Sequence, residues 1–317
     1  MDKIFFTYKI PDEGLLLLKG YDIMINTEDR FLSKEEIIQK AKDAVALVTL
    51  LSDKIDAELI KSLPKLKVIA NYAVGYNNID VEEARKRGVR VTNTPDVLTD
   101  ATADLTLALI LATSRRIVEG DRLVREHRFA GWKPDLLTGP SLKEKNLGII
   151  GLGRIGRAVA KRAQAFGMKV IYHNRKPLLT EEEEKLGVKH RSLEELLKES
   201  DFVSIHVPLT RETHHLLNEK RLSMMKPGAI LVNTARGSIV DEAALIEALK
   251  NGRLAAAGLD VYEEEPIVPQ SLIDMDNVVL LPHVGSATKE ARTEMAIMVG
   301  RNVAAVLEGK EPPNAVV

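Results

Sequence analysis

Short apolar runs alternate with helix-like segments along most of the chain. In the first hundred residues the apolar runs lie at 4–6, 23–25, 44–49, 67–71 and 89–91, and segments with helical spacing of apolar residues separate them. Strands that alternate with helices are typical of a parallel sheet with both faces covered by helices. The alternation resumes at residue 146 and continues to a last long helix at about 288–307. The pattern therefore predicts an α/β protein.

Helix boundaries are visible at several places. Capping boxes, in which Ser or Thr is followed three residues later by Glu, stand at 33–36, 180–183 and 192–195 and predict helix starts. A first helix is expected at 13–20. A helix from Thr99 has apolar residues nearly all round and is expected to be buried. The charged stretch 115–139 contains the only tryptophan, Trp132, and is predicted to be an irregular arm or loop that needs a partner surface.

Length and composition restrict the classes of protein to consider. A chain of 317 residues suggests two domains. With 45% hydrophobic residues, 29% charged residues and a net charge of −1, the composition is that of a soluble globular protein, and it gives no electrostatic reason to expect nucleic acid or an anionic membrane as partner. The absence of cysteine excludes disulfides and thiolate chemistry. Since neither a membrane span nor a signal peptide is visible, we expect a cytoplasmic protein.

A glycine motif follows the apolar run 147–150. Gly151, Gly153 and Gly156 have the GxGxxG spacing, and a helical pattern begins at once behind them. A strand, a glycine turn and a helix in this order are the context of dinucleotide binding. The residues of this turn predicted to bind the cofactor are Gly151, Gly153, Arg154, Ile155 and Gly156. We therefore predict two doubly wound parallel-sheet domains, Rossmann-like or flavodoxin-like, with a cleft between them.

The end of the next strand bears on the choice of cofactor. An NAD site usually has Asp or Glu there, roughly 20 residues beyond the glycines, to bind the ribose 2′-hydroxyl. This chain has Asn174, Arg175 and Lys176 instead. A carboxylate would repel a 2′-phosphate, whereas the two cations would attract one. The sequence therefore predicts a preference for NADP(H), with NAD(H) as the alternative cofactor.

Candidate chemical groups follow the later apolar runs. Arg236, Asp260 and His283 each come at the end of such a run, and Glu265 stands shortly after Asp260. Ligands of doubly wound sheets bind beyond the carboxyl ends of the strands. A guanidinium can hold a carboxylate in two places, an imidazole can give a proton to an alkoxide, and a carboxylate can orient the imidazole and favour its protonated form. No HExxH spacing occurs, and no metal site is predicted.

Two stretches lie at the corresponding ends of strands in the first hundred residues. One is 49–52, which includes Leu51, and the other is 71–76. The backbone N–H groups of Val74 and Gly75 are suited to holding a small carboxylate. On spacing alone, an ordinary turn between strand and helix is the better explanation of the second stretch.

Six segments in order resemble one known family. They are 71–80, 151–156, 206–210, 233–237, 258–266 and 282–288. Along essentially its whole length the chain resembles the D-isomer-specific 2-hydroxyacid dehydrogenases, and within them most closely the glyoxylate/hydroxypyruvate reductases. The resemblance implies a substrate-binding domain formed by 1–98 with 287–317, and a dinucleotide-binding Rossmann domain formed by 99–286 with a dimerisation arm at about 115–145.

The resemblance also implies roles for single residues. Arg236 would bind the carboxylate and carbonyl of the substrate, His283 would be the acid and base, and Glu265 would support His283. Further cofactor contacts are implied for Thr102, His206, Val207, Pro208, Thr234, Ala235, Arg236 and Asp260. Substrate contacts are implied for Leu51, Val74, Gly75, Arg236 and His283, and for Trp132 reaching over from the partner subunit of a homodimer.

The expected activity is hydride transfer from NADPH to a small 2-oxo acid, glyoxylate or hydroxypyruvate, with His283 as proton donor. One alternative is a dehydrogenase of another acid, such as 3-phosphoglycerate or D-lactate. The absence of Arg and Lys from 71–80 disfavours a phosphorylated substrate. Another alternative is a nucleotide-sensing binding protein, like the transcriptional corepressors with this fold, which keep the same site residues.

Overall fold

The computed structural model describes all residues from 1 to 317. The chain folds into two compact units, one formed by 1–98 with 286–317 and the other by 99–285. Each unit contains one sheet, and every strand pairing in both sheets is parallel. The prediction of two parallel-sheet α/β domains is therefore confirmed.

The first unit has a five-stranded sheet of order β2-β1-β3-β4-β5. This is a doubly wound order in which the direction of winding reverses between β1 and β3. The elements are β1 (Lys3–Phe6), α1 (Asp12–Leu15), β2 (Asp22–Ile25), α2 (Lys34–Ala41), β3 (Ala44–Thr49), α3 (Ala57–Ser62), β4 (Val68–Asn71), α4 (Val81–Lys86), β5 (Arg90–Thr92) and α13 (Lys289–Leu307).

The sequence explains the main packing of this unit. All six residues of β3 are buried, as a central parallel strand requires. The capping box of Ser33 and Glu36 starts α2. Helix α13 packs on α1. A Cβ at Gly14 would lie only 2.3 Å from the Ala296 carbonyl oxygen. A Cβ at Gly300 would likewise lie 2.3 Å from the Gly14 carbonyl oxygen. These glycines therefore permit the close approach of the two helices.

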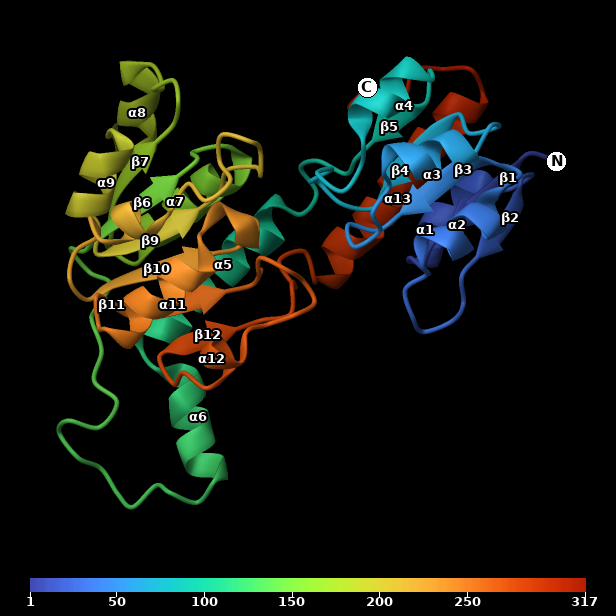
Figure 1. Ribbon diagram of the computed structural model, residues 1–317. Coiled ribbons are helices and arrows are strands. Elements are labelled where there is room, and N and C mark those ends of the chain that lie inside the picture. Colours follow the sequence, from blue (N-terminus) through green and yellow to red (C-terminus); the bar gives the residue numbers. More distant parts are fainter. The chain divides into compact units, whose positions relative to one another are not determined.

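The second unit has a seven-stranded sheet of order β12-β11-β10-β9-β6-β7-β8, which winds outward in both directions from β6 and β9 (Figure 1). The elements are α5 (Thr99–Ser114), α6 (Ile117–Arg125), β6 (Asn146–Ile150), α7 (Arg154–Ala165), β7 (Lys169–His173), α8 (Thr180–Leu186), β8 (Val188–His190), α9 (Leu193–Glu199), β9 (Phe202–Ile205), α10 (Glu219–Leu222), β10 (Ala229–Asn233), α11 (Glu242–Lys250), β11 (Leu254–Leu259), α12 (Gln270–Ile273) and β12 (Val278–Leu280).

Two hydrophobic clusters cover the two faces of this sheet. Buried residues of α5 and α7 form one cluster, and buried residues of α9, α10 and α11 form the other. Half of α5 is buried, as its apolar pattern predicts, and it packs on α7, β10 and β11. The carboxyl ends of the strands are thereby held in a fixed frame.

No helix of the protein combines the length and apolar character that crossing a bilayer requires.

The structure differs from the sequence-based expectations at four places. The helix expected at 13–20 is α1 followed by a 3-10 turn at Leu16–Leu18. The stretch 115–139, predicted to be irregular, contains α6, because ion pairs such as Arg125–Asp121 stabilise a helix whose apolar side chains are not buried. Helix α8 begins without a side-chain cap, since Thr180 is its first helical residue. Strand β9 ends at Ile205, although the apolar run of the sequence from 202 to 208 predicts a longer strand.

Candidate active site

The glycine turn connects β6 to α7 and leaves space at the helix N-terminus. Gly151 has φ +97°, and a Cβ there would lie 2.8 Å from the His206 carbonyl oxygen. A Cβ at Gly156 would lie 2.2 Å from the Gly151 carbonyl oxygen, so glycine is needed for the helix to approach the strand. A Cβ at Gly153 would meet nothing within 4 Å. Glycine at 153 therefore leaves open space directly beside the first turn of α7, where Arg154 and Ile155 lie.

Asn174 follows β7 and is connected to this turn. Its Oδ1 accepts a hydrogen bond of 2.7 Å from the Leu152 N–H. Arg175 and Lys176 come next and are exposed, and neither forms an ion pair within the chain. The edge of the glycine turn is thus lined by an amide and two free cations, with no carboxylate among residues 174–176.

His206 and the residues after it border the same turn from β9. The Nε2 atom of His206 lies 2.8 Å from Oγ of Ser204. Burial lowers the pKa of His206 to about 3, so its imidazole is neutral at physiological pH. Val207 is partly buried, and Pro208 is exposed. A neutral, polar surface therefore follows β9 next to the glycines.

Arg236 lies in a tight turn behind β10. The amide of the buried Asn233 holds this turn: its Nδ2 donates to the Arg236 carbonyl at 2.9 Å, and its Oδ1 accepts from the Ala235 N–H at 3.0 Å. Arg236 Nη1 donates to the Ala235 carbonyl at 2.6 Å. Burial lowers the pKa of the Arg236 guanidinium, while the charge of Glu265 opposes this effect. The guanidinium therefore lies in a partly desolvated place close to a carboxylate.

His283 and Glu265 are in direct contact. His283 follows β12, Glu265 lies in the loop after β11, and His283 Nδ1 is 2.8 Å from Glu265 Oε2. Because a carboxylate only accepts, Nδ1 carries the proton and Nε2 is directed elsewhere. Glu265 Oε1 accepts the Tyr262 N–H at 3.1 Å. Burial alone would raise the pKa of Glu265, but the hydrogen bond and charge of His283, with smaller effects of Tyr262 and Arg236, lower it below its ordinary value.

Asp260 lies at the end of β11 and is only 1% exposed. Its Oδ1 accepts the Val284 N–H at 2.7 Å, and its Oδ2 has no hydrogen-bond partner in the protein. Burial raises the pKa of Asp260, although the Val284 N–H and His283 oppose the shift. A buried oxygen without a partner marks a place where a ligand donor would be satisfied.

Helix α5 holds the strand ends together by hydroxyl groups. Thr102 Oγ1 donates to the Gly285 carbonyl at 3.1 Å, and the hydroxyls of Thr106 and Thr234 are 3.0 Å apart. The turns behind β10 and β12 are thus fixed to the same helix. Sequence reasoning missed Thr106. The only signal was a polar residue one helical turn after Thr102 inside an apolar helix.

The loop 71–78 lies at the strand ends of the first unit. Asn71 Nδ2 donates to the Gly75 carbonyl at 2.7 Å, and Asn93 Nδ2 donates to the Val74 carbonyl at 2.8 Å. These bonds hold both carbonyls toward the protein, and the N–H groups of Val74 and Gly75 donate no hydrogen bond within the chain. The partly buried Leu51 lies in the neighbouring loop, whose Leu50 carbonyl accepts from Asn78 Nδ2 at 3.1 Å. Asn78 and Asn93 were not singled out from the sequence.

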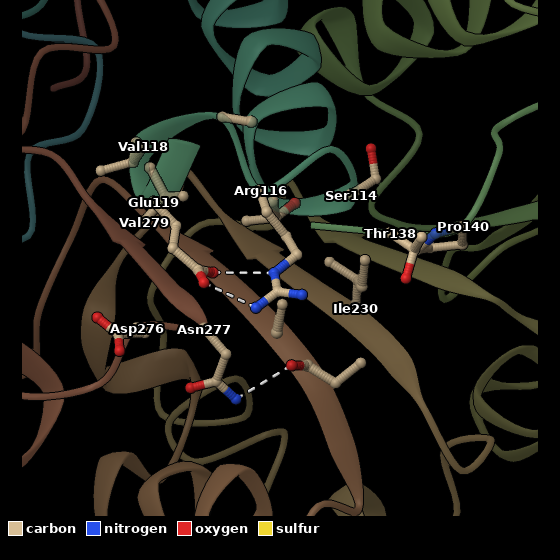
Figure 2. Close-up of a pocket in the computed structure, with 15 residues that line it drawn as sticks. Ser114, Arg116, Val118, Glu119, Thr138, Pro140, Ile230, Asp276, Asn277 and Val279 are labelled. Atoms are coloured by element: carbon tan, nitrogen blue, oxygen red, sulfur yellow. Dashed lines mark hydrogen bonds and ion pairs between the residues drawn. The ribbon is translucent and has the colours of Figure 1, made fainter. Parts of the chain in front are cut away.

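Trp132 is not packed into its own chain, since its side chain is 81% exposed. Near the base of the same arm is a pocket of about 300 Å³ lined by α5, the arm and the starts of β11 and β12 (Figure 2). Arg116 extends across it and forms an ion pair of 2.8 Å with Glu119. None of the predicted catalytic or cofactor residues lines this pocket. The candidate active site is therefore the set of strand ends, not this pocket.

The residues present fit a nicotinamide dinucleotide. The open space above Gly153, the free N-terminus of α7 and the neutral surface at His206 match the needs of a pyrophosphate. The unpartnered oxygen of Asp260, close to His283, matches an amide donor. The second unit thus brings together Arg236, Glu265, His283 and Asp260 at neighbouring strand ends, with the glycine turn on the same sheet.

Comparisons with known proteins agree with this assignment. A family model described as D-isomer specific 2-hydroxyacid dehydrogenase, NAD binding domain, matches residues 107–285. The chain is 54% identical to a glyoxylate reductase of Thermococcus litoralis, over 99% of this chain and 96% of that one.

Two solved structures are similar over the full length. One is an NADPH-dependent glyoxylate/hydroxypyruvate reductase from Sinorhizobium meliloti in complex with NADP and malonate, at 36% identity and a TM-score of 0.89 over 100% of this chain and 97% of that one. The other is a D-lactate dehydrogenase from Aquifex aeolicus complexed with NAD and lactic acid, at 32% identity and a TM-score of 0.88 over 100% and 99%.

Fold, strand-end residues and comparisons together define an oxidoreductase that uses a nicotinamide cofactor. More narrowly, the chain belongs to the D-isomer specific 2-hydroxyacid dehydrogenase family. The family membership expected from the six sequence segments is confirmed.

Proposed function

We propose that this chain reduces a small 2-oxo acid, glyoxylate or hydroxypyruvate, to the 2-hydroxy acid, with NADP(H) as preferred cofactor. The observation that carries the proposal is the His283–Glu265 pair, 2.8 Å apart and beside the Arg236 guanidinium. The name of the Thermococcus litoralis relative, glyoxylate reductase, supports the choice of substrate at 54% identity.

The proposed mechanism divides the work among three side chains. A reduced nicotinamide, when bound at these strand ends, would supply the hydride, and the side chains of the protein do the rest. Arg236 binds the carboxylate and the carbonyl oxygen of the substrate, which places the carbonyl carbon and increases its polarisation. His283 gives a proton to the developing alkoxide, and Glu265 keeps the imidazole oriented and favours its protonated form. In the reverse direction the same imidazole takes the proton back.

The remaining roles follow from the local geometry. The dinucleotide-binding domain is proposed as 99–286. In it, the strand ends next to Arg236 and Asp260 are held or lined by three residues, Thr102, Thr234 and Ala235. In the substrate-binding domain, proposed as 1–98 with 287–317, the free N–H groups of Val74 and Gly75 receive the substrate carboxylate, and Leu51 adds an apolar contact. No lysine or arginine stands in 71–80, which suits a small, unphosphorylated acid.

The cofactor preference rests on the end of β7. Arg175 and Lys176 are exposed without ion-pair partners, and Asn174 replaces the carboxylate that would bind a 2′-hydroxyl. An adenosine 2′-phosphate would give both cations a partner, and the Sinorhizobium meliloti relative is NADPH-dependent by its name. These points support NADP(H) over NAD(H).

We also propose that the chain forms a homodimer through its arm. Helix α6 has no buried residue, and the arm exposes Ile117, Val118, Val124, Phe129 and Trp132. A second copy would cover these apolar side chains and bring its own Trp132 near the substrate. Light scattering coupled to size exclusion tests this proposal: a mass of twice the 35.1 kDa chain supports it, and the mass of one chain contradicts it.

The activity is tested by initial rates of cofactor oxidation on a panel of acids. Glyoxylate, hydroxypyruvate, pyruvate and 3-phosphohydroxypyruvate are each supplied with NADPH and with NADH. The highest kcat/KM is expected for glyoxylate or hydroxypyruvate with NADPH. Preference for pyruvate or for the phosphorylated acid would replace the substrate assignment, and tight NADPH binding without turnover on any acid would favour a sensor of nucleotides.

A further inference from the structure

Three side chains with metal-ligating atoms meet outside the proposed catalytic group. His214 and His215 lie in the loop between β9 and α10, and Glu263 lies in the loop after β11. One ligand atom of each lies within 4.8 Å of the other two. This cluster is not visible in the sequence, because Glu263 is 48 residues away from His215 along the chain.

The two adjacent histidines present their rings on the same side. Consecutive residues in extended chain point in opposite directions, but His215 has φ +48°, in the left-handed region. As a result the two imidazoles stack, with centroids 4.1 Å apart and planes inclined by 25°. A non-glycine residue in this conformation is held there by its surroundings. The loop therefore brings both rings to one side of the chain, and rotation of the exposed His214 ring out of the stack would let one nitrogen of each face a single ion.

Hydrogen bonds fix the backbone around the three groups. The His215 N–H donates to the Ser238 carbonyl at 2.8 Å, and the Leu217 N–H donates to the Ile239 carbonyl at 3.0 Å. Glu263 is fixed through α11, since its N–H donates to Glu242 Oε1 at 3.3 Å. His215 Nε2 is 2.6 Å from Glu263 Oε1. Most of the ordering that a ligand set requires is thus already present without a bound ion.

The surroundings carry negative charge without a basic partner. Neither Glu242, Glu263 nor Glu264 forms an ion pair with a lysine or arginine. Oε1 of Glu242 accepts the Glu263 N–H at 3.3 Å, so the carboxylates of these two residues belong to neighbouring, connected segments. A cation at Glu263 would reduce the repulsion between their like charges.

We propose that His214, His215 and Glu263 bind one divalent cation of the zinc, cobalt and nickel type. Two imidazoles and one carboxylate are ligands that these metals prefer, whereas magnesium and calcium prefer oxygen alone. Metal–nitrogen bonds are about 2.0–2.1 Å long, so tetrahedral ligand atoms stand about 3.3 Å apart. The cation would replace the short His215–Glu263 hydrogen bond, the ring of the exposed His214 would turn inward, and water would complete the coordination. Glu263 stands two residues before Glu265, but none of the three proposed ligands belongs to the proposed catalytic group.

The test uses the full-length protein after treatment with a chelator. Cobalt chloride is added, and binding is followed by calorimetry and by the visible absorption of cobalt, which reports imidazole coordination and low coordination number. The variant is His214→Ala, because His214 is exposed and its removal leaves the His215–Glu263 contact intact. The control is His127→Ala, which removes another exposed histidine from the arm.

We expect the wild type and H127A to bind one cobalt ion per chain. The affinity of H214A should be lower by at least about tenfold, because one ligand of the ion is lost. A second variant, Glu263→Gln, should weaken binding in the same way while circular dichroism shows a folded chain. Absence of saturable binding up to millimolar cobalt, or equal affinity of H214A and wild type, would overturn the proposal.

Discussion

The Nδ1 atom of His283 lies 2.8 Å from Oε2 of Glu265, although the two residues follow different strands of the sheet. The contact depends on the parallel pairing of β11 with β12, which brings both strand ends to one edge. Glu265 is also fixed by the Tyr262 N–H at 3.1 Å. The imidazole is therefore held in one tautomer, with Nε2 left for the substrate.

Replacing Glu265 by glutamine should lower kcat and change its pH dependence. The carboxylate favours the protonated imidazole, and the pair lowers the pKa of Glu265 itself. Glutamine can still accept the imidazole N–H but has no ionisation, so the loss of activity that protonation of Glu265 causes at acid pH, below the ordinary range of glutamate, should be absent from the pH profile of the variant. We expect kcat to fall by up to roughly 10²–10⁴-fold, the contribution of positioned acid–base catalysis that depends on this pair. An unchanged pH profile would contradict this role.

The cations behind β7 should matter for NADPH and not for NADH. In the double variant Arg175→Ala and Lys176→Ala, two charge-assisted contacts to a 2′-phosphate are lost, each worth about 1.5–3 kcal/mol. We expect kcat/KM with NADPH to fall at least about 100-fold, while the value with NADH stays within a factor of about two. Lys198→Ala, which removes an exposed lysine from α9, is the matched control. A parallel loss with both cofactors would exclude selection by these side chains.

Two glycines of the same turn should behave differently on substitution by alanine. A Cβ at Gly156 would lie 2.2 Å from the Gly151 carbonyl oxygen, so Gly156→Ala should cost about 1–3 kcal/mol of stability. A Cβ at Gly153 meets only open space, so Gly153→Ala should keep the wild-type Tm. It should nevertheless weaken NADPH binding, because the methyl group enters the space proposed for the pyrophosphate. Wild-type affinity in G153A would contradict that placement.

Asp260→Asn should stabilise the protein at neutral pH and weaken the cofactor complex. Burial raises the pKa of Asp260 in the folded state, so its ionisation reduces stability as pH rises above the ordinary range of aspartate. The amide can still accept the Val284 N–H. Thermal unfolding should show a higher Tm for D260N than for the wild type at pH 7, by roughly 2–4 °C for each kcal/mol of stability gained. This difference in Tm should become smaller near about pH 4, where the wild-type carboxyl is protonated in the folded state. A lower Tm at pH 7 would show that the charge stabilises the fold.

Much of the fold was accessible from the sequence because both sheets are parallel and buried. The apolar runs at 44–49 and 147–150 correspond to β3 and β6, and the glycine turn has the strand and helix that its spacing implies. Helix α6 was missed although its sequence is amphipathic, because the stretch 115–139 was interpreted as a whole from its charged composition and its apolar residues are not buried within the chain. The capping box predicted at 180–183 was wrong, because Thr180 is already the first residue of α8 and no side chain caps this helix.

The chemistry of the strand ends was accessible only in part. Residue type and position suggested Arg236, Glu265 and His283. The tautomer of His283 and the role of Asn233 in the Arg236 turn depend on hydrogen bonds that only the three-dimensional structure shows. The neighbourhood of His214, His215 and Glu263 was not accessible, because it depends on a positive φ at His215 and on loops far apart in sequence. Local patterns predict elements well, whereas contacts between loops depend on the whole fold.

The most direct test of the central claim compares His283→Ala with the wild type in the reduction of glyoxylate by NADPH. If His283 is the proton donor, kcat should fall by roughly 10²–10⁴-fold while the Kd for NADPH, measured by cofactor fluorescence, stays near the wild-type value. The control His127→Ala should have wild-type kcat. A His283→Ala enzyme that keeps near wild-type kcat would show that another group supplies the proton.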